Sequence, residues 1–339
     1  MEVPDYQLPP EAIAQRPVEP RHASRLLVSL DPDDSPRHLH VGDLPGLLRK
    51  GDVLVVNTTK VLPARLRLHK RSGGAAEVML LAPEGDEGIE SVNWTALVRP
   101  GRRLPAGTML FLGDQALVEV GEVVADGTRR VRLVAGGASV SQLLDEFGAI
   151  PLPPYIHEQL ADSRRYQTVY ADRPGSVAAP TAGLHLSEQV LADCRAKGVA
   201  VAAVDLAVGL GTFRPLSADR VEDHVMHRER YRVAAATVQA CRDARRVVAV
   251  GTTTVRALES AAATGRLEGD TELYVHGAYP FQVVDVLLTN FHQPRSSLLV
   301  LLEAFCGPRW RDLYEEALVE GYRFLSFGDA MLVGRRLTA

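Results

Sequence analysis

The feature that most constrains the fold is a change in sequence texture near residues 67 and 150. Between these points, short β-rich runs alternate with Gly, Pro or Asp, in the order EVMLLAP, VNWTALVRPG, TMLFLGD, ALVEVGEVVADG and TRRVRLVAGG. Closely spaced strands separated by turn residues are typical of a small antiparallel barrel or sandwich. We therefore predict that residues 67–150 form an inserted small antiparallel β-barrel domain.

The flanking segments follow a different pattern, in which apolar runs alternate with helical periods. GVAVAAVDLAVG follows the helix-like SEQVLADCRAK, and RRVVAVG precedes TTTVRALESAAATG. Such alternation is typical of an α/β fold. Because the apolar run GDVLVVN before the insertion is of the same kind, we predict one large discontinuous α/β domain, barrel-like in form, built from residues 1–66 and 151–339.

Composition excludes several classes of protein. The 339 residues are 46% hydrophobic, which is enough for a buried core, and the net charge of −4 leaves any nucleic-acid contact to a local basic patch. The three cysteines form no CxxC pair, and no apolar run approaches the roughly 18 residues of a membrane span. We expect a soluble, cytoplasmic protein without a metal site or disulfide framework.

The stretch GSVAAPTAGLHL, residues 175–186, has two interpretations. Small uncharged residues suit a closely packed loop. They also suit a ligand pocket, in which Thr181, backbone amides and His185 would supply the polar contacts.

The stretch KVLPARLRLHKRSGG predicts a strand with one apolar and one basic face. Arg65, Arg67 and Arg71 fall on the basic face, and either Arg102 and Arg103 or Arg129, Arg130 and Arg132 would extend it. Such a row fits a phosphate backbone, or an ordinary solvated strand edge.

The segment VVAVGTTTVRALES predicts a buried strand, a glycine turn and a helix that begins at three threonines. Ligands of α/β proteins bind where parallel strands end, so Thr252 and Thr253 are candidate binding residues. Arg256 and Glu259 share a helical face and form either a surface ion pair or part of a site. Three threonines in succession exceed what one helix cap needs, which favours the site.

Two further segments are rich in polar side chains. EDHVMHRE places His224 and His227 three residues apart among carboxylates, without a third metal ligand at a recognised spacing, so a polar network is favoured over a metal site. TNFHQPRSSLL places Asn290 and His292 in a turn that proline interrupts, which makes it a candidate for a site.

Taken together, the motifs resemble the S-adenosylmethionine:tRNA ribosyltransferase-isomerase family of queuosine biosynthesis. The matching motifs, in order, are SRLLV, GDVLVVN with TTKVLPARL, VNWTALVRPGRRL, IPLPPYI, RYQTVYA, GSVAAPTAGLHL, VGLGTFRPL, EDHVMH, GTTTVRALES, VVDVLLTNFHQPRSSLL and YRFLSFGDAM. The resemblance implies a large α/β domain with an inserted β-barrel. It also implies transfer and isomerisation of the ribosyl part of S-adenosylmethionine onto a 7-aminomethyl-7-deazaguanine base in tRNA, which gives epoxyqueuosine and releases adenine and methionine.

The resemblance also implies roles for particular residues. His185, His224 and His227 would be catalytic, and His185 would carry a proton near neutral pH. The tRNA would be held by Lys60, Arg65, Arg67 and Arg71. The substrate would be bound by Tyr166, Gln167, Thr168, Pro180, Thr181, Gly183, Thr252, Thr253, Arg256, Glu259, Asn290, His292 and Asp329. No metal or other cofactor would be needed, and we expect a monomer.

At five positions this chain differs from residues that are usual in that family, namely Lys60, Leu186, Ala207, Gln293 and Glu303. Lys60 replaces a bidentate guanidinium by a single ammonium, and Ala207 replaces a histidine. Two alternatives therefore stay open. One is a relative that uses S-adenosylmethionine with a small-molecule acceptor, and the other is a catalytically silent RNA-binding homologue.

Overall fold

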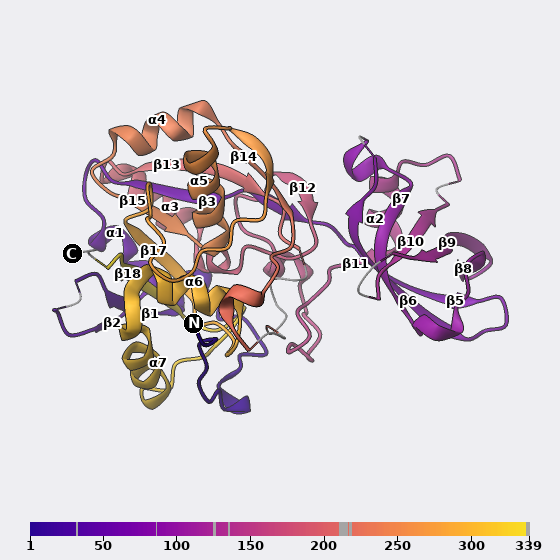
Figure 1. The fold of residues 1–339 in the computed structure, drawn as a ribbon, viewed down its shortest axis with the longest axis horizontal. Coiled ribbons are helices and arrows are strands. Elements are labelled where there is room, and N and C mark those ends of the chain that lie inside the picture. The colour runs from indigo at the N-terminus through magenta and orange to yellow at the C-terminus, as the bar shows by residue number, and fades with distance from the viewer. Residues whose placement is uncertain are drawn as a thin grey trace. The chain divides into compact units, whose positions relative to one another are not determined.

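The computed structural model describes residues 1–31, 33–85, 87–124, 127–134, 136–209, 216 and 219–336. The chain divides into two compact units (Figure 1). The larger unit contains Met1–Lys60, Pro153–Arg173 and Ala179–Ala339, and the smaller contains Val61–Leu152 with Pro174–Ala178. The smaller unit thus begins at Val61, and its first barrel strand begins at Arg65. The sequence pattern predicted that the inserted domain begins at residue 67.

The smaller unit is a closed antiparallel barrel of six strands, because β5 pairs with both β6 and β8 at the ends of the order β5-β6-β7-β10-β9-β8. The short strand β11 (Gly148–Ala149) adds to β5, and helix α2 (Val140–Phe147) precedes it. The barrel strands are β5 (Arg65–Lys70), β6 (Ala75–Pro83), β7 (Asn93–Arg99), β8 (Thr108–Leu112), β9 (Gln115–Val123) and β10 (Arg129–Leu133).

Alternation of buried and exposed side chains explains why these segments form a barrel. In β10, Arg129, Val131 and Leu133 are buried while Arg130 and Arg132 are exposed. A period of two places one side of each strand inside the barrel. The predicted β-rich runs are therefore barrel strands.

The larger unit is built on a mixed nine-stranded sheet in the order β16-β14-β13-β3-β15-β17-β18-β1-β2. Four neighbouring strands, β13, β3, β15 and β17, are parallel. The strands are β1 (Arg25–Ser29), β2 (Arg37–His40), β3 (Val53–Asn57), β13 (Ala200–Leu206), β14 (Glu229–Val233), β15 (Val247–Val250), β16 (Glu268–Thr271), β17 (Val286–Asn290) and β18 (Ala330–Gly334). Two further strands, β4 (Thr59–Val61) and β12 (Arg173–Ser176), pair only with each other among the described residues.

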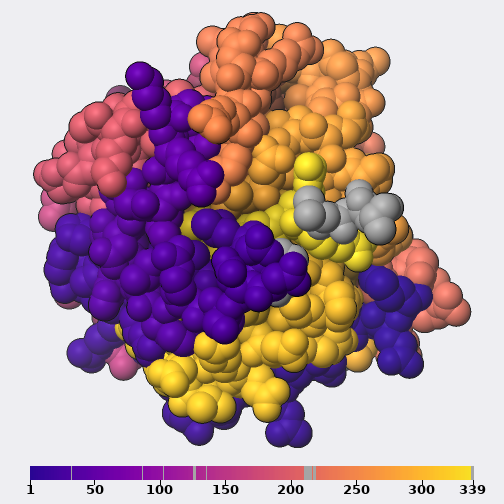
Figure 2. All heavy atoms as spheres, turned by 90° about the vertical axis from the view of Figure 1, so that its left-hand side faces the viewer, coloured from indigo at the N-terminus to yellow at the C-terminus, as the bar shows by residue number. Residues whose placement is uncertain are grey.

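This arrangement confirms the predicted fold class, an α/β domain with an inserted antiparallel barrel. Within the described residues, however, the large sheet has β16 and β2 as its two ends, so it is an open sheet. The parallel pairing of β1 with β18 joins the two ends of the chain, and Figure 2 shows the indigo N-terminal and yellow C-terminal segments side by side on one face.

The central strands of the large sheet are buried throughout, because helices cover both faces of the sheet. On one face, Leu54, Val56 and Val248 form a core with α1 (Leu44–Leu47) and α3 (Glu188–Ala196). Helix α5 (Thr252–Thr264) contacts β13, β15 and β3. The remaining helices of this unit are α4 (Ala235–Asp243), α6 (Ser297–Cys306) and α7 (Trp310–Val319). No helix among the described residues is long and apolar enough to cross a bilayer.

Candidate functional site

The carboxyl ends of the parallel strands gather polar residues at one edge of the large sheet. Asn57 ends β3, Thr252 and Thr253 follow β15, and Asn290 ends β17. Parallel strands place their carboxyl ends together, and open α/β sheets bind ligands there. This edge is therefore the candidate site.

Three neighbouring hollows lie at this edge, and Leu298 of α6 lines all of them. Each hollow encloses about 300 to 330 Å³ of space, part of which is open to solvent. The Ser326 hollow is lined by Tyr155, Thr181, Asn290, Phe291, His292, Gln293, Ser296, Leu298, Leu325 and Ser326. The central hollow is lined by Ala179, Pro180, Thr181, Ala182, Val208, Gly251, Thr252, Thr253, Thr289, Asn290, His292 and Leu298. The Arg256 hollow is lined by Met226, Thr252, Thr253, Arg256, Leu273, Tyr274, Val275, Ser297, Leu298 and Leu301.

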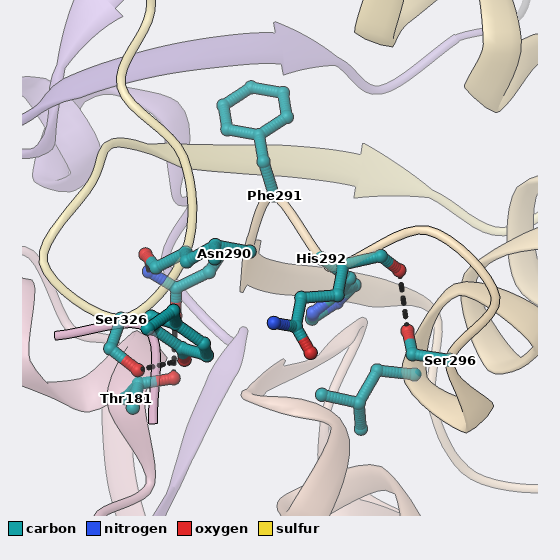
Figure 3. Close-up of a pocket in the computed structure, with 10 residues that line it drawn as sticks. Thr181, Asn290, Phe291, His292, Ser296 and Ser326 are labelled. Carbon is teal, nitrogen blue, oxygen red and sulfur yellow. Dashed lines mark hydrogen bonds between the residues drawn. The ribbon is translucent and has the colours of Figure 1, made fainter. Parts of the chain in front are cut away.

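The walls of the Ser326 and central hollows are uncharged, since their described lining residues include no Asp, Glu, Lys or Arg. Figure 3 shows Thr181, Asn290 and Ser326 grouped on one side of the Ser326 hollow, with Ser296 opposite and Phe291 pointing away. An uncharged polar wall suits a nucleoside better than a bare polyphosphate, which requires cations or many free amides.

Asn290 is the centre of a buried hydrogen-bond chain. It accepts from the Thr181 hydroxyl at 2.9 Å, and its Nδ2 lies 2.9 Å from Nε2 of His185. On the other side of the imidazole ring, Nδ1 lies 2.9 Å from the hydroxyl oxygen of Ser24. Thr181 and His185 lie in one short 3-10 turn, Thr181–His185, which packs against β17. The structure thus brings together Thr181, His185 and Asn290, three site candidates that lie in two separate motifs of the sequence.

His185 does not suit the predicted role of a proton carrier near neutral pH. It is 3% exposed, and burial, followed by the nearby Arg323, Arg165 and Arg21, lowers its pKa to about 3. The ring is therefore neutral at pH 7 and acts through its two hydrogen bonds. His292 is similar, because burial lowers its pKa to about 3 and its Nε2 lies 3.0 Å from the Thr289 hydroxyl.

The amino-terminal end of α5 faces the central and Arg256 hollows. Gly251 precedes the helix with a φ of 87°, a conformation that favours glycine, and Thr254 returns its hydroxyl to the Val250 carbonyl at 2.7 Å. The backbone amides of Thr252 and Thr253 have no hydrogen-bond partner within the described part of the chain. They remain as donors toward a polar ligand group.

Arg256 and Glu259 do not form a surface ion pair, which was the alternative to a role in the site. Both are buried, and Arg256 pairs instead with the buried Glu229, while its Nε donates to the Leu273 carbonyl at 3.0 Å. Glu259 accepts from the backbone amides of residues 282–284 at 2.8 to 3.1 Å. Arg256 lines a hollow and stays a candidate for substrate binding, whereas Glu259 supports a loop.

Two other predicted binding residues have structural partners. Asp329 accepts from the backbone amides of Arg25 and Arg323, at 2.9 and 2.8 Å. Gly183 leaves room for Tyr170, since a β-carbon there would lie 2.1 Å from the Tyr170 hydroxyl. Neither residue lines any of the three hollows.

The motif RYQTVYA begins in the 3-10 turn Ser163–Tyr166, which contacts the Thr181–His185 turn. Tyr166 and Thr168 are buried, Gln167 is half-buried, and none of them lines the three hollows. Tyr166 packs edge-on against Phe327, with ring centroids 5.9 Å apart. In contrast, the central hollow is lined by six of the predicted binding residues, namely Pro180, Thr181, Thr252, Thr253, Asn290 and His292.

His224 and His227 lie beside the Arg256 hollow. The His224 ring contacts Tyr274, a wall residue, with centroids 5.4 Å apart. Burial, followed by the charge of His227, lowers the pKa of His224, and His227 is exposed. No group of three metal-ligating side chains occurs in the described ranges.

The predicted basic row is only partly free. Lys60, Arg67 and Arg71 are exposed, but Arg65 is half-buried and pairs with Glu77 at 3.7 Å. The Arg71 guanidinium lies 5.4 Å from the centre of the Phe111 ring. Arg129 does not extend the row, because it is buried and donates to the carbonyls of Gly121, Gly101 and Leu104.

Of the five unusual positions, Gln293 alone lines a hollow. Leu186 is in the core, and Ala207 is half-buried beside the wall residue Val208. Glu303 pairs with Arg311 at 3.0 Å and accepts from the Trp310 indole. The motif VGLGTFRPL extends into residues 210–215, which lie outside the described residues.

Sequence reasoning missed several residues that build this edge. Asn57 binds both backbone groups of Leu206, at 3.0 and 3.1 Å, and its Nδ2 donates to the Thr253 hydroxyl at 3.2 Å. A polar residue at the end of the apolar run GDVLVVN was the available signal. Tyr155, Ser326 and Leu298 gave no comparable local pattern.

Comparison with known proteins agrees with the fold and identifies the family. The family described as "Queuosine biosynthesis protein" matches residues 2–333. The S-adenosylmethionine:tRNA ribosyltransferase-isomerase of Rubrobacter xylanophilus is 49% identical over 97% of this chain and 96% of its own length, and that of Moorella thermoacetica is 49% identical over 97% and 98%. The crystal structure of S-adenosylmethionine tRNA ribosyltransferase from Thermotoga maritima is similar with a TM-score of 0.55 and 35% identity, covering 97% of this chain and 99% of that one. The chain therefore belongs to the queuosine biosynthesis protein family.

Proposed function

We propose that this protein is an S-adenosylmethionine:tRNA ribosyltransferase-isomerase. It transfers and isomerises the ribosyl moiety of S-adenosylmethionine onto a 7-aminomethyl-7-deazaguanine base in tRNA, gives epoxyqueuosine, and releases adenine and methionine. The observation that carries the proposal is the near-complete match to enzymes of that name, which covers both the barrel and the α/β unit.

The hollows supply what this chemistry requires. The reaction needs a site that excludes water and holds a nucleoside with a sulfonium cation, and the uncharged walls of the Ser326 and central hollows do not repel such a cation. Leu298, Val208 and Ala182 provide apolar surface, while Thr181 and the amides of Thr252 and Thr253 provide polar contacts. We place the nucleoside there.

The Arg256 hollow suits the amino-acid part of the substrate. Met226, Leu273 and Leu301 give it an apolar wall, and Nη2 of Arg256 is buried without a hydrogen-bond partner in the described structure. A carboxylate is the usual partner of a guanidinium. We assign the carboxylate of the methionine part to this position.

The acid–base chemistry falls to a group that is less buried than His185 and His292. Both of these have a pKa of about 3, so they are weak bases and serve as neutral hydrogen-bonding groups. His224 is half-exposed and lies against Tyr274 of the Arg256 hollow, and partial burial lowers its pKa, which favours the neutral form that can accept a proton. We assign removal of the proton beside the sulfonium to His224.

The wider setting of the activity is also part of the proposal. S-adenosylmethionine is a substrate here, and we expect no cofactor or metal. We place the protein in the cytoplasm, where it acts on tRNA as a monomer.

The test is to incubate the protein with labelled S-adenosylmethionine and either precursor-bearing tRNA or free 7-aminomethyl-7-deazaguanine, and to measure adenine release. We expect release with the tRNA and transfer of label to it. Leu298→Trp places a larger side chain at a position that lines all three hollows and should abolish release, whereas Val319→Trp, at an exposed position of α7, should not.

The acceptors separate the alternatives. Release with the free base alone would reject the tRNA reaction in favour of a small-molecule acceptor. No release with either acceptor, from protein that binds tRNA, would favour a silent RNA-binding homologue.

A further inference from the structure

In the hydrogen-bond chain Thr181–Asn290–His185–Ser24, the donor and the acceptor of each bond can be assigned. Two backbone carbonyls, those of Leu325 and Arg21, determine the assignment because a carbonyl can only accept. Nδ2 of Asn290 lies 3.1 Å from the Leu325 carbonyl as well as 2.9 Å from Nε2 of His185. If the amide were reversed, Oδ1 would face the Leu325 carbonyl with no proton between two acceptors. The amide nitrogen must therefore face Leu325 and His185.

The orientation of Asn290 determines the tautomer of His185. Because Nδ2 donates to Nε2, Nε2 carries no proton and the single proton of the neutral ring is on Nδ1. Nδ1 then donates to Ser24 at 2.9 Å, and the Ser24 hydroxyl donates to the Arg21 carbonyl at 3.1 Å. Every group in the chain is satisfied in this direction, and the Arg21 carbonyl ends it.

At the other end, Oδ1 of Asn290 faces Thr181, 2.9 Å from its hydroxyl oxygen. Because Oδ1 is an acceptor, the Thr181 proton is used within the protein. The lone pairs of the Thr181 oxygen remain, and Thr181 lines both the Ser326 and the central hollow. A hydroxyl that is otherwise free to donate or accept is thus restricted to accepting.

We propose that Thr181 is a specificity-determining residue that accepts a hydrogen bond from an N–H or O–H group of the adenosyl part of the substrate, with its polarity set by Asn290, His185 and Ser24. This inference rests on the proposed function and adds the chemistry of recognition. Thr181 touches the substrate, and Asn290, His185 and Ser24 are positioning residues. The donor is the 6-amino group of adenine or a ribose hydroxyl.

The polarity is tested by ¹⁵N NMR of histidine-labelled protein at pH 7. We expect the His185 signals of a neutral ring with the proton on Nδ1 and a bare Nε2. Asn290→Asp replaces the donor at this position by a carboxylate, which only accepts, so Nε2 of His185 should carry a proton in this variant. A wild-type ring that carries its proton on Nε2 would overturn the inference.

The recognition is tested by calorimetric binding of S-adenosylmethionine and of analogues that lack the 6-amino group, the 2′-hydroxyl or the 3′-hydroxyl. Thr181→Val should weaken binding of S-adenosylmethionine about 2- to 10-fold, the usual effect of one lost hydrogen bond, and Thr181→Ser should preserve it. One analogue should bind wild-type protein more weakly than S-adenosylmethionine does, by a similar factor. The Thr181→Val variant should bind that analogue and S-adenosylmethionine with equal affinity. That analogue identifies the donor, and a purely structural role of Thr181 would produce no such coupling.

The outcomes separate this inference from the proposed function. If wild-type protein binds and turns over S-adenosylmethionine but no analogue is coupled to Thr181, the inference alone is wrong. If wild-type protein does not bind S-adenosylmethionine, the proposed function and the inference both fall.

Discussion

At the scale of single residues, the site depends on polar groups that are buried and satisfied. His185, Asn290 and Asn57 are each at most 3% exposed, and each has hydrogen-bond partners on more than one side. A buried polar group without a partner costs about 1 to 3 kcal/mol, so such networks specify one arrangement of the side chains. This network and the close packing at Gly183 hold the Thr181–His185 turn in one arrangement.

Gly183 in that turn is required by packing. Gly183→Ala should lower the free energy of unfolding by about 1 to 3 kcal/mol, because the new methyl group overlaps the buried Tyr170 hydroxyl, 2.1 Å from the ideal β-carbon. Chemical denaturation measures the change. Tyr170→Phe should restore part of the loss in the double variant, and Gly175→Ala, with no atom within 4 Å, is the matched control. Equal stability of the two alanine variants would contradict the packing argument.

The buried histidines predict a dependence of stability on pH. The pKa of His185 falls to about 3 on folding, below its ordinary value of 6.5, so the unfolded chain binds the proton more readily between these values. Its contribution is complete above pH 6.5 and is lost as pH falls toward 3. At pH 5 the loss amounts to about 1 to 2 kcal/mol.

Denaturation at several pH values measures this slope. His185→Gln should flatten the decline between pH 7 and pH 5, whatever its effect on stability at pH 7. His157→Gln, at an exposed position, controls for the loss of a histidine as such. A slope that is unchanged in His185→Gln would show that the ring is already protonated or accessible in the folded state.

At the scale of elements, the sequence predicted those parts whose physics is local. The five β-rich runs became barrel strands β6 to β10, and GDVLVVN became β3, because alternation and apolar runs are set by neighbouring residues. The pairing of Arg256 with Glu229 was not predictable, since Glu229 lies 27 residues away and the two meet only through the packing of α5 on β14. The chain from Ser24 to Asn290 likewise joins segments that only the finished sheet brings together.

Asn57 of β3 is hydrogen-bonded to Leu206 of β13 and to Thr253 of α5. Its replacement therefore tests whether these bonds hold the three elements together at the site. Asn57→Ala should destabilise the protein by about 2 to 3 kcal/mol, because both backbone groups of Leu206 lose a buried partner. Adenine release should fall as well, since Thr253 loses its contact with β3. Asn93→Ala, at an exposed position of β7, is the control and should change stability by less than about 0.5 kcal/mol. A mild effect of Asn57→Ala in both assays would show that the strand ends are held by packing alone.

At the scale of the whole molecule, the net charge does not favour binding of tRNA, so binding depends on local groups of unpaired cationic side chains. The chain carries a net charge of −4, and several barrel arginines are neutralised by neighbours, among them Arg130 by Glu84 and Arg132 by Glu119. Arg67 and Arg71 are exposed and have no ion pair within the described residues. If the barrel binds the tRNA backbone, these two side chains are among those available for phosphates.

The salt dependence of tRNA binding distinguishes free from paired arginines on the same barrel. Each arginine that contacts a phosphate releases counterions, and its loss lowers the slope of log affinity against log salt by about 0.7 to 0.9. The double variant Arg67→Ala and Arg71→Ala should therefore flatten the slope by about 1.4 to 1.8 and weaken binding at low salt. Arg130→Ala with Arg132→Ala removes the same formal charge from paired positions, so its slope should stay near that of the wild type. If the two double variants gave the same slope, Arg67 and Arg71 would be ordinary solvated surface and the tRNA would be bound elsewhere.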